Sequence, residues 1–254
     1  MGEAAITAGP PGFLPDRSDQ AKPLLRRHRV RVVAGEVHAI LHHHDIRGAE
    51  LAHIDGHAHW LSALGAETLI LSAIPQRTGG AGHGIVLDNA EWAHLLHSIG
   101  SVQHVCARYK LRLAFQPMFG STIQGPEDIE RLLVGSDAGI CLDLAHLILA
   151  GADPIEVLDL GQGRIQHVQL NDVDGDLAEQ VREHGEDYVE AVGMGLYKPL
   201  GEGIAKVDRV VEELRRSKYR GWYTLRQETR LPTADVRPLG GISRSLDHLM
   251  PLLG

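Results

Sequence analysis

Seven short apolar runs, separated by segments with helical spacing, are the feature that most constrains the fold of this 254-residue chain. Most of the runs are continuously apolar, which is typical of strands buried on both faces of a parallel sheet. Strands that alternate with helices predict right-handed βαβ units. The predicted strands are residues 4–7, 30–37, 68–74, 112–118, 139–145, 165–171 and 222–228.

Segments of helical periodicity fill the intervals between these runs. The clearest is residues 89–109, where apolar side chains recur every three or four residues from Trp92 to Cys106, with Asp88 or Asn89 as the cap. The other predicted helices are residues 19–28, 49–64, 126–134, 154–160, 177–192, 207–217 and 243–252.

The number of units and the lack of a dinucleotide-binding turn favour a (β/α) TIM-type barrel over a Rossmann sheet, as a single domain over residues 1–254. A full barrel has eight strands, and seven are recognisable in this α/β chain. The glycine-rich stretch "RTGGAGHG" (77–84) has neither the lysine of a P-loop nor the GxGxxG spacing. We interpret it as a loop over the barrel mouth.

Composition excludes several classes of partner. A formal net charge of −8 argues against nucleic-acid binding, and no apolar run is long enough for a membrane helix. Cys106 and Cys141 are isolated in apolar contexts, which suggests reduced core thiols and a cytoplasmic protein. A small-molecule substrate is the expected partner, and a homodimer is one way to cover the open edges of an incomplete barrel.

In TIM barrels the chemistry takes place where the C-terminal ends of the strands converge. Polar residues recur at these ends, although polar side chains that end apolar strands are costly unless they are satisfied or used. They are Glu36, His38, Ser72, Gln76, Gln116, Asp143, His146, His167, Gln169, Asn171, Gln227 and Glu228.

Motifs along nearly the whole chain resemble the xylose-isomerase-like TIM-barrel superfamily of isomerases, epimerases and dehydratases, and within it most closely the myo-inosose dehydratases. The matching stretches are "GPPGFLP" (9–15), "LAFQPMFGSTIQ" (113–124), "CLDLAHLILAGADP" (141–154), "RIQHVQLNDV" (164–173), "LYKPLGEG" (196–203) and "YRGWYTLRQE" (219–228). They occur in the order of the family, whose members place about one β-α unit before the first stretch. The resemblance therefore implies that this α/β barrel lacks the first β-α unit.

The resemblance implies a divalent metal held by one side chain from each of four strand ends. The corresponding residues here are Gln116, Asp143, Gln169 and Glu228, so two of the four are neutral amides. Hard divalent ions favour anionic oxygens and imidazole nitrogens. We therefore expect either no required cofactor or a weakly bound Mn²⁺ or Mg²⁺, and no nucleotide cofactor. The lysine that acts on substrate in the family is replaced by Asn171.

Several other residues are candidates for the site. His38 could act as a general base near neutral pH, and His146 could orient Asp143 or move protons. Glu36 and Lys198 are candidate substrate contacts, each balanced against a plain surface role. Of the helix histidines, His57 is the best candidate for the site, although it shares a face with His53 at a zinc-binding spacing. The tract His42, His43 and His44 is expected to be a solvated loop, because three adjacent side chains cannot all face one ion.

Three functions remain open from the sequence. The first is a diverged dehydratase, lyase or cyclase that removes the α-proton of a β-hydroxy ketone or β-dicarbonyl compound and expels water, without metal and in secondary metabolism. Asp143, His146, Glu228, His38 and His57 would share the acid-base chemistry. The second is a metal-dependent sugar isomerase or epimerase, and the third is an inactive barrel with a binding or scaffold role.

Overall fold

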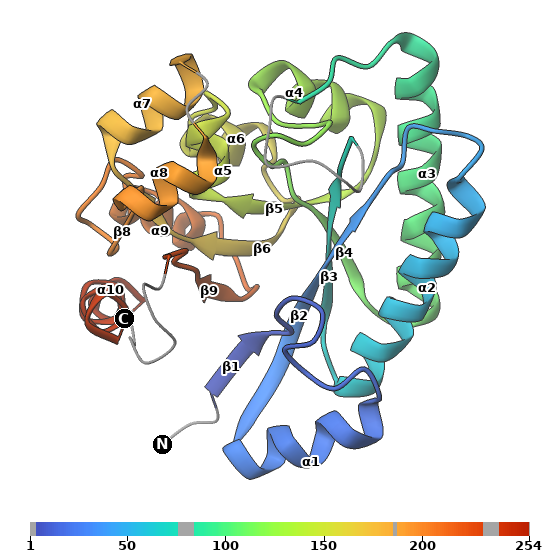
Figure 1. Ribbon diagram of the computed structural model, residues 1–254, viewed down its shortest axis with the longest axis horizontal. Coiled ribbons are helices and arrows are strands. Elements are labelled where there is room, and N and C mark those ends of the chain that lie inside the picture. The colour runs from blue at the N-terminus through green and yellow to red at the C-terminus, as the bar shows by residue number, and fades with distance from the viewer. Residues whose placement is uncertain (1–3, 76–83, 185–186, 231–238, 254) are drawn as a thin grey trace.

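The computed structural model describes residues 4–75, 84–184, 187–230 and 239–253. Seven parallel strands form one sheet that curves into a nearly closed barrel, with helices packed outside it (Figure 1). The predicted seven-stranded barrel is confirmed, one strand short of a full TIM barrel. The strands are β1 (Ala4–Thr7), β2 (Val30–Ala39), β3 (Thr68–Ala73), β4 (Arg112–Phe115), β5 (Gly139–Asp143), β6 (Ile165–Leu170) and β9 (Tyr223–Leu225), in that order.

Ten helices lie in the described part of the chain. They are α1 (Ser18–His28), α2 (Arg47–Leu64), α3 (Asn89–Arg108), α4 (Pro126–Gly135), α5 (Leu144–Leu149), α6 (Pro154–Leu160), α7 (Gly175–His184), α8 (Tyr188–Met194), α9 (Val207–Arg216) and α10 (Leu239–Leu253). A short antiparallel pair, β7 (Asp172–Val173) and β8 (Tyr197–Lys198), lies apart from the barrel sheet. Asp88 caps α3 as predicted, in a capping box with Glu91.

Several predicted boundaries were wrong. The strands predicted at 112–118 and 222–228 end three residues earlier, at residues 115 and 225. Asp143 ends β5 and its side chain caps α5, so the predicted strand 139–145 turns into a helix after residue 143. The predicted helix 177–192 is two helices, because Asp187 caps a new start at α8. Gln76 and residues 77–83 of the glycine-rich stretch lie outside the described residues.

The barrel interior contains a small apolar layer below the polar mouth. Ala34, Ile70, Ala114 and Cys141, one from each of β2 to β5, pack together and are fully buried. Larger aliphatic clusters fill the space between the sheet and the helices. Cys106 and Cys141 are both buried free thiols, and burial raises the pKa of Cys106 to about 12. None of the described helices is long and apolar enough to cross a membrane.

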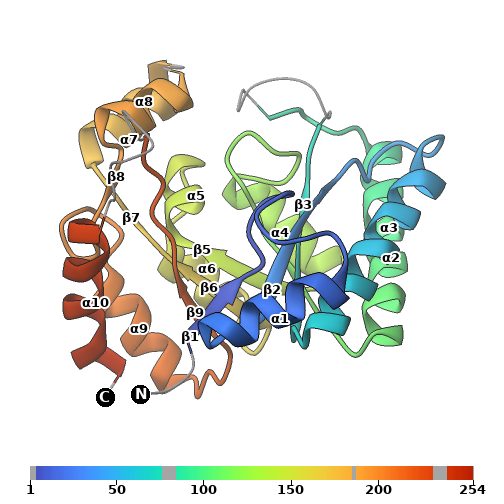
Figure 2. The ribbon, with the colours of Figure 1, turned by 60° about the horizontal axis from the view of Figure 1, so that its bottom comes forward.

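The barrel has a seam where its first and last strands meet. β1 and β9 lie near each other in both views (Figures 1 and 2), but the sheet order gives no ladder between them in the described residues. Side chains bridge this seam at two levels. Near one end the Arg31 guanidinium of β2 lies over the Trp222 ring, 5.1 Å from its centroid. Towards the mouth, Arg226 Nη1 is 3.1 Å from Glu36 Oε1.

Candidate active site

The mouth layer follows from the two-residue period of the strands. Side chains two residues beyond the interior apolar layer point to the same side of the sheet, which places Glu36, Gln116 and Asp143 together at the C-terminal ends. Hydrogen bonds connect them to one another, to Gln169 in β6 and to Arg226 after β9. With Glu228, these six residues form a connected group, which we call the mouth cluster.

Asp143 is the fully buried carboxylate of the cluster. Its Oδ1 accepts from the His146 backbone N–H at 3.1 Å and from Asn171 Nδ2 at 2.9 Å. Its Oδ2 accepts from Gln116 Nε2 at 3.0 Å and lies 4.0 Å from Arg226 Nη1. Because a buried carboxylate is costly unless it is paired and hydrogen-bonded, these contacts explain how it is retained.

The two glutamines that replace charged or imidazole groups of the family are buried and orient each other. Gln116 Nε2 donates to Gln169 Oε1 at 3.3 Å, and Gln169 Nε2 donates to Glu36 Oε1 at 2.7 Å. Reversing the Gln116 amide would place its oxygen against two acceptors, so the network determines its orientation. Gln116 Oε1 is then left buried without a partner among the described residues.

Arg226 is the member of the cluster that the sequence analysis missed. Its Nη1 donates to Glu36 Oε1 and Gln169 Oε1, both at 3.1 Å, and its Nη2 donates to Glu228 Oε1 at 2.9 Å. Burial opposes the charge, but Glu36, Asp143 and Glu228 more than offset this and raise the pKa of Arg226. The sequence did offer one indication of Arg226. Residues 226 and 228 are two apart, so in an extended segment both side chains point to the same side, and either could occupy the mouth layer.

Glu228 lies one strand period beyond Arg226 and connects the cluster to two tyrosines. Tyr188 Oη donates to Glu228 Oε2 at 2.8 Å and is also 2.8 Å from Tyr197 Oη. Burial and the nearby Glu228 raise the pKa of Tyr188, so its hydroxyl remains protonated at neutral pH. Neither tyrosine was predicted, since Tyr188 lay inside a predicted helix.

The predicted histidines occupy three different environments. His146 is buried and stacks on the Tyr188 ring with centroids 6.3 Å apart, and its Nδ1 is buried without a partner among the described residues. His38 is solvent-exposed near the mouth; surrounding protein lowers its pKa, with contributions from Arg226 and His146 that Glu36 opposes. His57 lies on α2, outside the barrel, where it hydrogen-bonds the Glu36 backbone.

Of the remaining predicted contacts, one belongs to the site and one does not contact the mouth cluster. Asn171 is buried and belongs to the site through Asp143, while its own oxygen accepts from the Ala145 N–H at 2.6 Å. Lys198 on β8 instead forms an ion pair with Asp174 at 3.1 Å, and no contact connects it to the mouth cluster in the described residues.

The residues at the predicted metal position do not fit a divalent ion. Oxygens of Asp143, Gln169 and Glu228 there already accept N–H groups, which come from Gln116, Asn171 and Arg226. A metal ion at their centre would have to displace these donors and lie against a guanidinium. We therefore assign no chemistry at the mouth to a metal.

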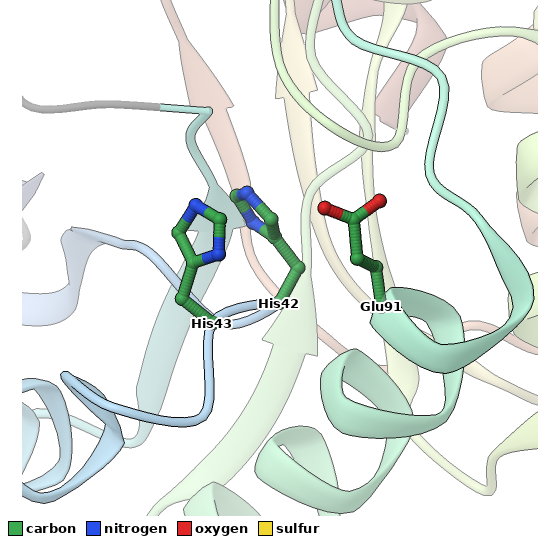
Figure 3. A group of neighbouring side chains, drawn as sticks. All are labelled: His42, His43 and Glu91. Carbon is green, nitrogen blue, oxygen red and sulfur yellow. The ribbon is translucent and has the colours of Figure 1, made fainter.

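A second group of side chains could hold a cation. His42 and His43, in the loop after β2, face Glu91 in the first turn of α3, with ligand atoms all within 4.8 Å of one another (Figure 3). We call these three residues the histidine cluster. The prediction of a solvated loop was wrong for His42, which is 1% exposed with both ring nitrogens buried and unpartnered among the described residues. His43 and His44 are exposed as expected.

Comparisons with known proteins agree with this architecture. An inosose dehydratase of Geobacillus thermodenitrificans (strain NG80-2) is 27% identical over 181 residues, 68% of this chain and 61% of that protein. The chain thus matches less than two thirds of that relative's length.

Solved structures show the same fold at low identity. The probable 3-DHS dehydratase AsbF of Bacillus anthracis, involved in petrobactin synthesis, superposes with a TM-score of 0.67 at 14% identity, covering 89% of this chain and 79% of that one. The IOLI protein, whose structure contains a bound zinc atom, gives 0.68 at 15% identity, covering 99% and 87%. The family model described as xylose isomerase-like TIM barrel matches residues 3–252, so this chain belongs to that family.

Proposed function

We propose that this protein is a dehydratase that removes water from a β-hydroxy ketone or a related β-dicarbonyl compound. The observation that carries the proposal is a base and an acid side by side at the mouth. The unpartnered Nδ1 belongs to His146, whose ring stacks on Tyr188, and the Tyr188 hydroxyl is hydrogen-bonded to Glu228. Relatives named as dehydratases support the same reaction class.

Dehydration needs a base for the α-proton and an acid for the departing hydroxyl. In the proposed reaction His146 takes the α-proton, the electron pair forms the new C=C bond, and the β-hydroxyl leaves as water. The proton for this hydroxyl comes from the hydrogen-bonded pair of Tyr188 and Glu228, with Tyr197 behind it. His38 is the second candidate for the base, because its lowered pKa keeps the imidazole neutral at physiological pH.

Substrate binding would use the free acceptor of the cluster. Gln116 Oε1 is placed to accept a hydroxyl of the substrate. The three carboxylates of the mouth cluster outnumber its one guanidinium, which disfavours anionic substrates. We therefore place the substrate among neutral hydroxy ketones and polyketone-like compounds of secondary metabolism, a field to which the AsbF neighbour also belongs.

The test is proton exchange at the α-carbon, measured by NMR in D₂O over a panel of neutral β-hydroxy ketones, together with the ultraviolet absorbance of the enone product. Exchange and enone formation are expected with the native chain. His146→Gln should abolish both, whereas Tyr188→Phe should slow enone formation more than exchange. Exchange without enone formation would instead indicate an isomerase or epimerase, and neither signal on any compound would contradict an enzymatic role.

A further inference from the structure

The Arg226 guanidinium lies at the position where the family resemblance implies a divalent metal ion. Its nitrogens reach residues from three strands: Glu36 in β2, Gln169 in β6 and Glu228 just after β9 itself, with Asp143 at 4.0 Å. Three of the four expected metal positions, Asp143, Gln169 and Glu228, are thus neighbours of one cation. Arg226 is only about 30% exposed, so this charge is largely shielded from water.

The oxygens around Arg226 are matched to N–H donors. Glu36 Oε1 accepts two N–H groups, from Arg226 and Gln169, and Gln169 Oε1 accepts two more, from Arg226 and Gln116. A guanidinium has a rigid plane with five N–H donors, which suits several oxygens at once. The amides that replaced charged or imidazole ligands therefore complement a guanidinium, since each supplies one acceptor to it or one donor to its carboxylates.

We propose that Arg226 is a built-in replacement for the divalent metal ion: it neutralises the mouth carboxylates and supplies the positive charge that stabilises the enolate oxygen. The second part rests on the proposed function, since only α-proton abstraction creates that enolate. The guanidinium has N–H groups beyond those already used, and a donor aimed at developing negative charge in a shielded site stabilises a transition state effectively. No metal, and no change of oxidation state, enters the reaction.

The experiment measures Mn²⁺ binding by electron paramagnetic resonance and by thermal unfolding, without any assay of activity. All variants carry His42→Leu, which removes the second group of candidate ligands. The parent should show no site up to about 1 mM Mn²⁺, and its unfolding temperature should respond to neither Mn²⁺ nor chelator. Arg226→Gln leaves three carboxylates around a vacated position, and should bind Mn²⁺ at least ~10-fold more tightly than the parent.

Arg226→Gln should also unfold at a lower temperature without metal and recover with Mn²⁺, so that even a poorly folded variant reports binding. Adding Asp143→Asn should remove that recovery. Arg226→Lys, which keeps the charge but loses the fork, should stay insensitive to Mn²⁺.

A Mn²⁺ site in the parent that Asp143→Asn removes would overturn the proposal, and so would an Arg226→Gln variant that binds no metal. Gain of metal by Arg226→Gln together with a chain inactive on every β-hydroxy ketone would instead contradict the proposed function and leave the replacement standing.

Discussion

Two groups of polar side chains lie at or just beyond the C-terminal parts of the strands, and they differ in how their buried atoms are satisfied. In the mouth cluster, Asp143 is fully buried but has a partner for each oxygen, and a guanidinium supplies the positive charge. In the histidine cluster, His42 is equally buried, yet both of its ring nitrogens lack a partner among the described residues. The first group has its cation built in, and the second has room for one.

This contrast shows how one barrel can lose an ion site and present another. An amide in place of a charged ligand is tolerated where a permanent side-chain cation balances the remaining carboxylates, because burying unpaired charge is expensive. An unpartnered imidazole keeps its lone pair and its capacity to bind a proton or a metal ion. The two clusters should therefore respond differently to substitution, to zinc and to acid.

Asp143→Ala should have the largest effect on stability, because it leaves the donors of Gln116 and Asn171 and part of the Arg226 charge without an acceptor. We expect the free energy of unfolding, measured by urea denaturation, to fall by about 3 kcal/mol, and the proposed dehydratase activity to be lost. Asp143→Asn keeps the shape and one acceptor and should cost less. A change within about 0.5 kcal/mol for Asp143→Ala would show that the cluster is not satisfied as described.

Zinc should stabilise the chain through the histidine cluster. At a free concentration ~100-fold above its dissociation constant, the stabilisation should be about 2.7 kcal/mol, measured as a shift of the thermal midpoint. His42→Leu should abolish the shift and Glu91→Gln should weaken it. The matched control is His104→Gln, on the same helix but outside the cluster, with its ring nitrogen near the Gly100 carbonyl. Equal shifts in all three variants would assign the zinc to surface histidines.

Acid should lower the stability of the folded chain because His42 is buried. Burial, followed by the charge of His43, lowers the pKa of His42 in the folded chain. The unfolded chain therefore binds more protons below about pH 6.5, and the stability present above that pH is lost as pH falls towards the folded pKa. We expect the native chain to lose ~1 kcal/mol more than His42→Leu between neutral pH and about pH 5.5, by urea denaturation. Parallel curves would mean that His42 titrates normally.

A substitution at the seam between β1 and β9 should have the smallest effect on stability. Arg31→Gln removes the cation over the Trp222 ring and an ion pair with Glu67 at 3.0 Å, and should cost about 1 kcal/mol in urea denaturation. Glu67→Gln keeps the ring contact but removes both this ion pair and a second one with Arg112 at 3.2 Å, so Arg112→Gln, which removes only the second pair, completes the comparison. If Arg31→Gln costs no more than the difference between Glu67→Gln and Arg112→Gln, the ring contact contributes nothing.

The sequence predicted the strands well because their buried, continuous apolar character is local information. Boundaries failed where one residue plays two roles: Asp143 ends an apolar run and also caps a helix, and the second role depends on the direction in which the chain turns. His42 shows a similar limit, because its burial results from packing at a loop that the tract of histidines alone does not indicate.

The candidate site was only partly predictable for a related reason. Asp143, Gln116 and Gln169 end strongly apolar strands, so their convergence followed from the barrel. Arg226 and Glu228 follow one short strand and point to the same side of the extended chain. Only the hydrogen-bond network shows that the arginine lies at the centre of the cluster, with the glutamate as its partner. Tyr188 reaches the site from a helix that begins at a cap inside a segment predicted as continuous.

The ion pair between Arg226 and Glu36 connects the ends of two strands that no backbone ladder joins in the described residues. It therefore holds the two strands together mechanically, in addition to balancing charge. A ligand that draws the guanidinium towards itself would weaken this connection and make the barrel more flexible along the seam between β1 and β9. Hydrogen exchange in β1 and β9 would then respond to substrate, while β3 to β5, on the far side of the barrel, would remain stiff.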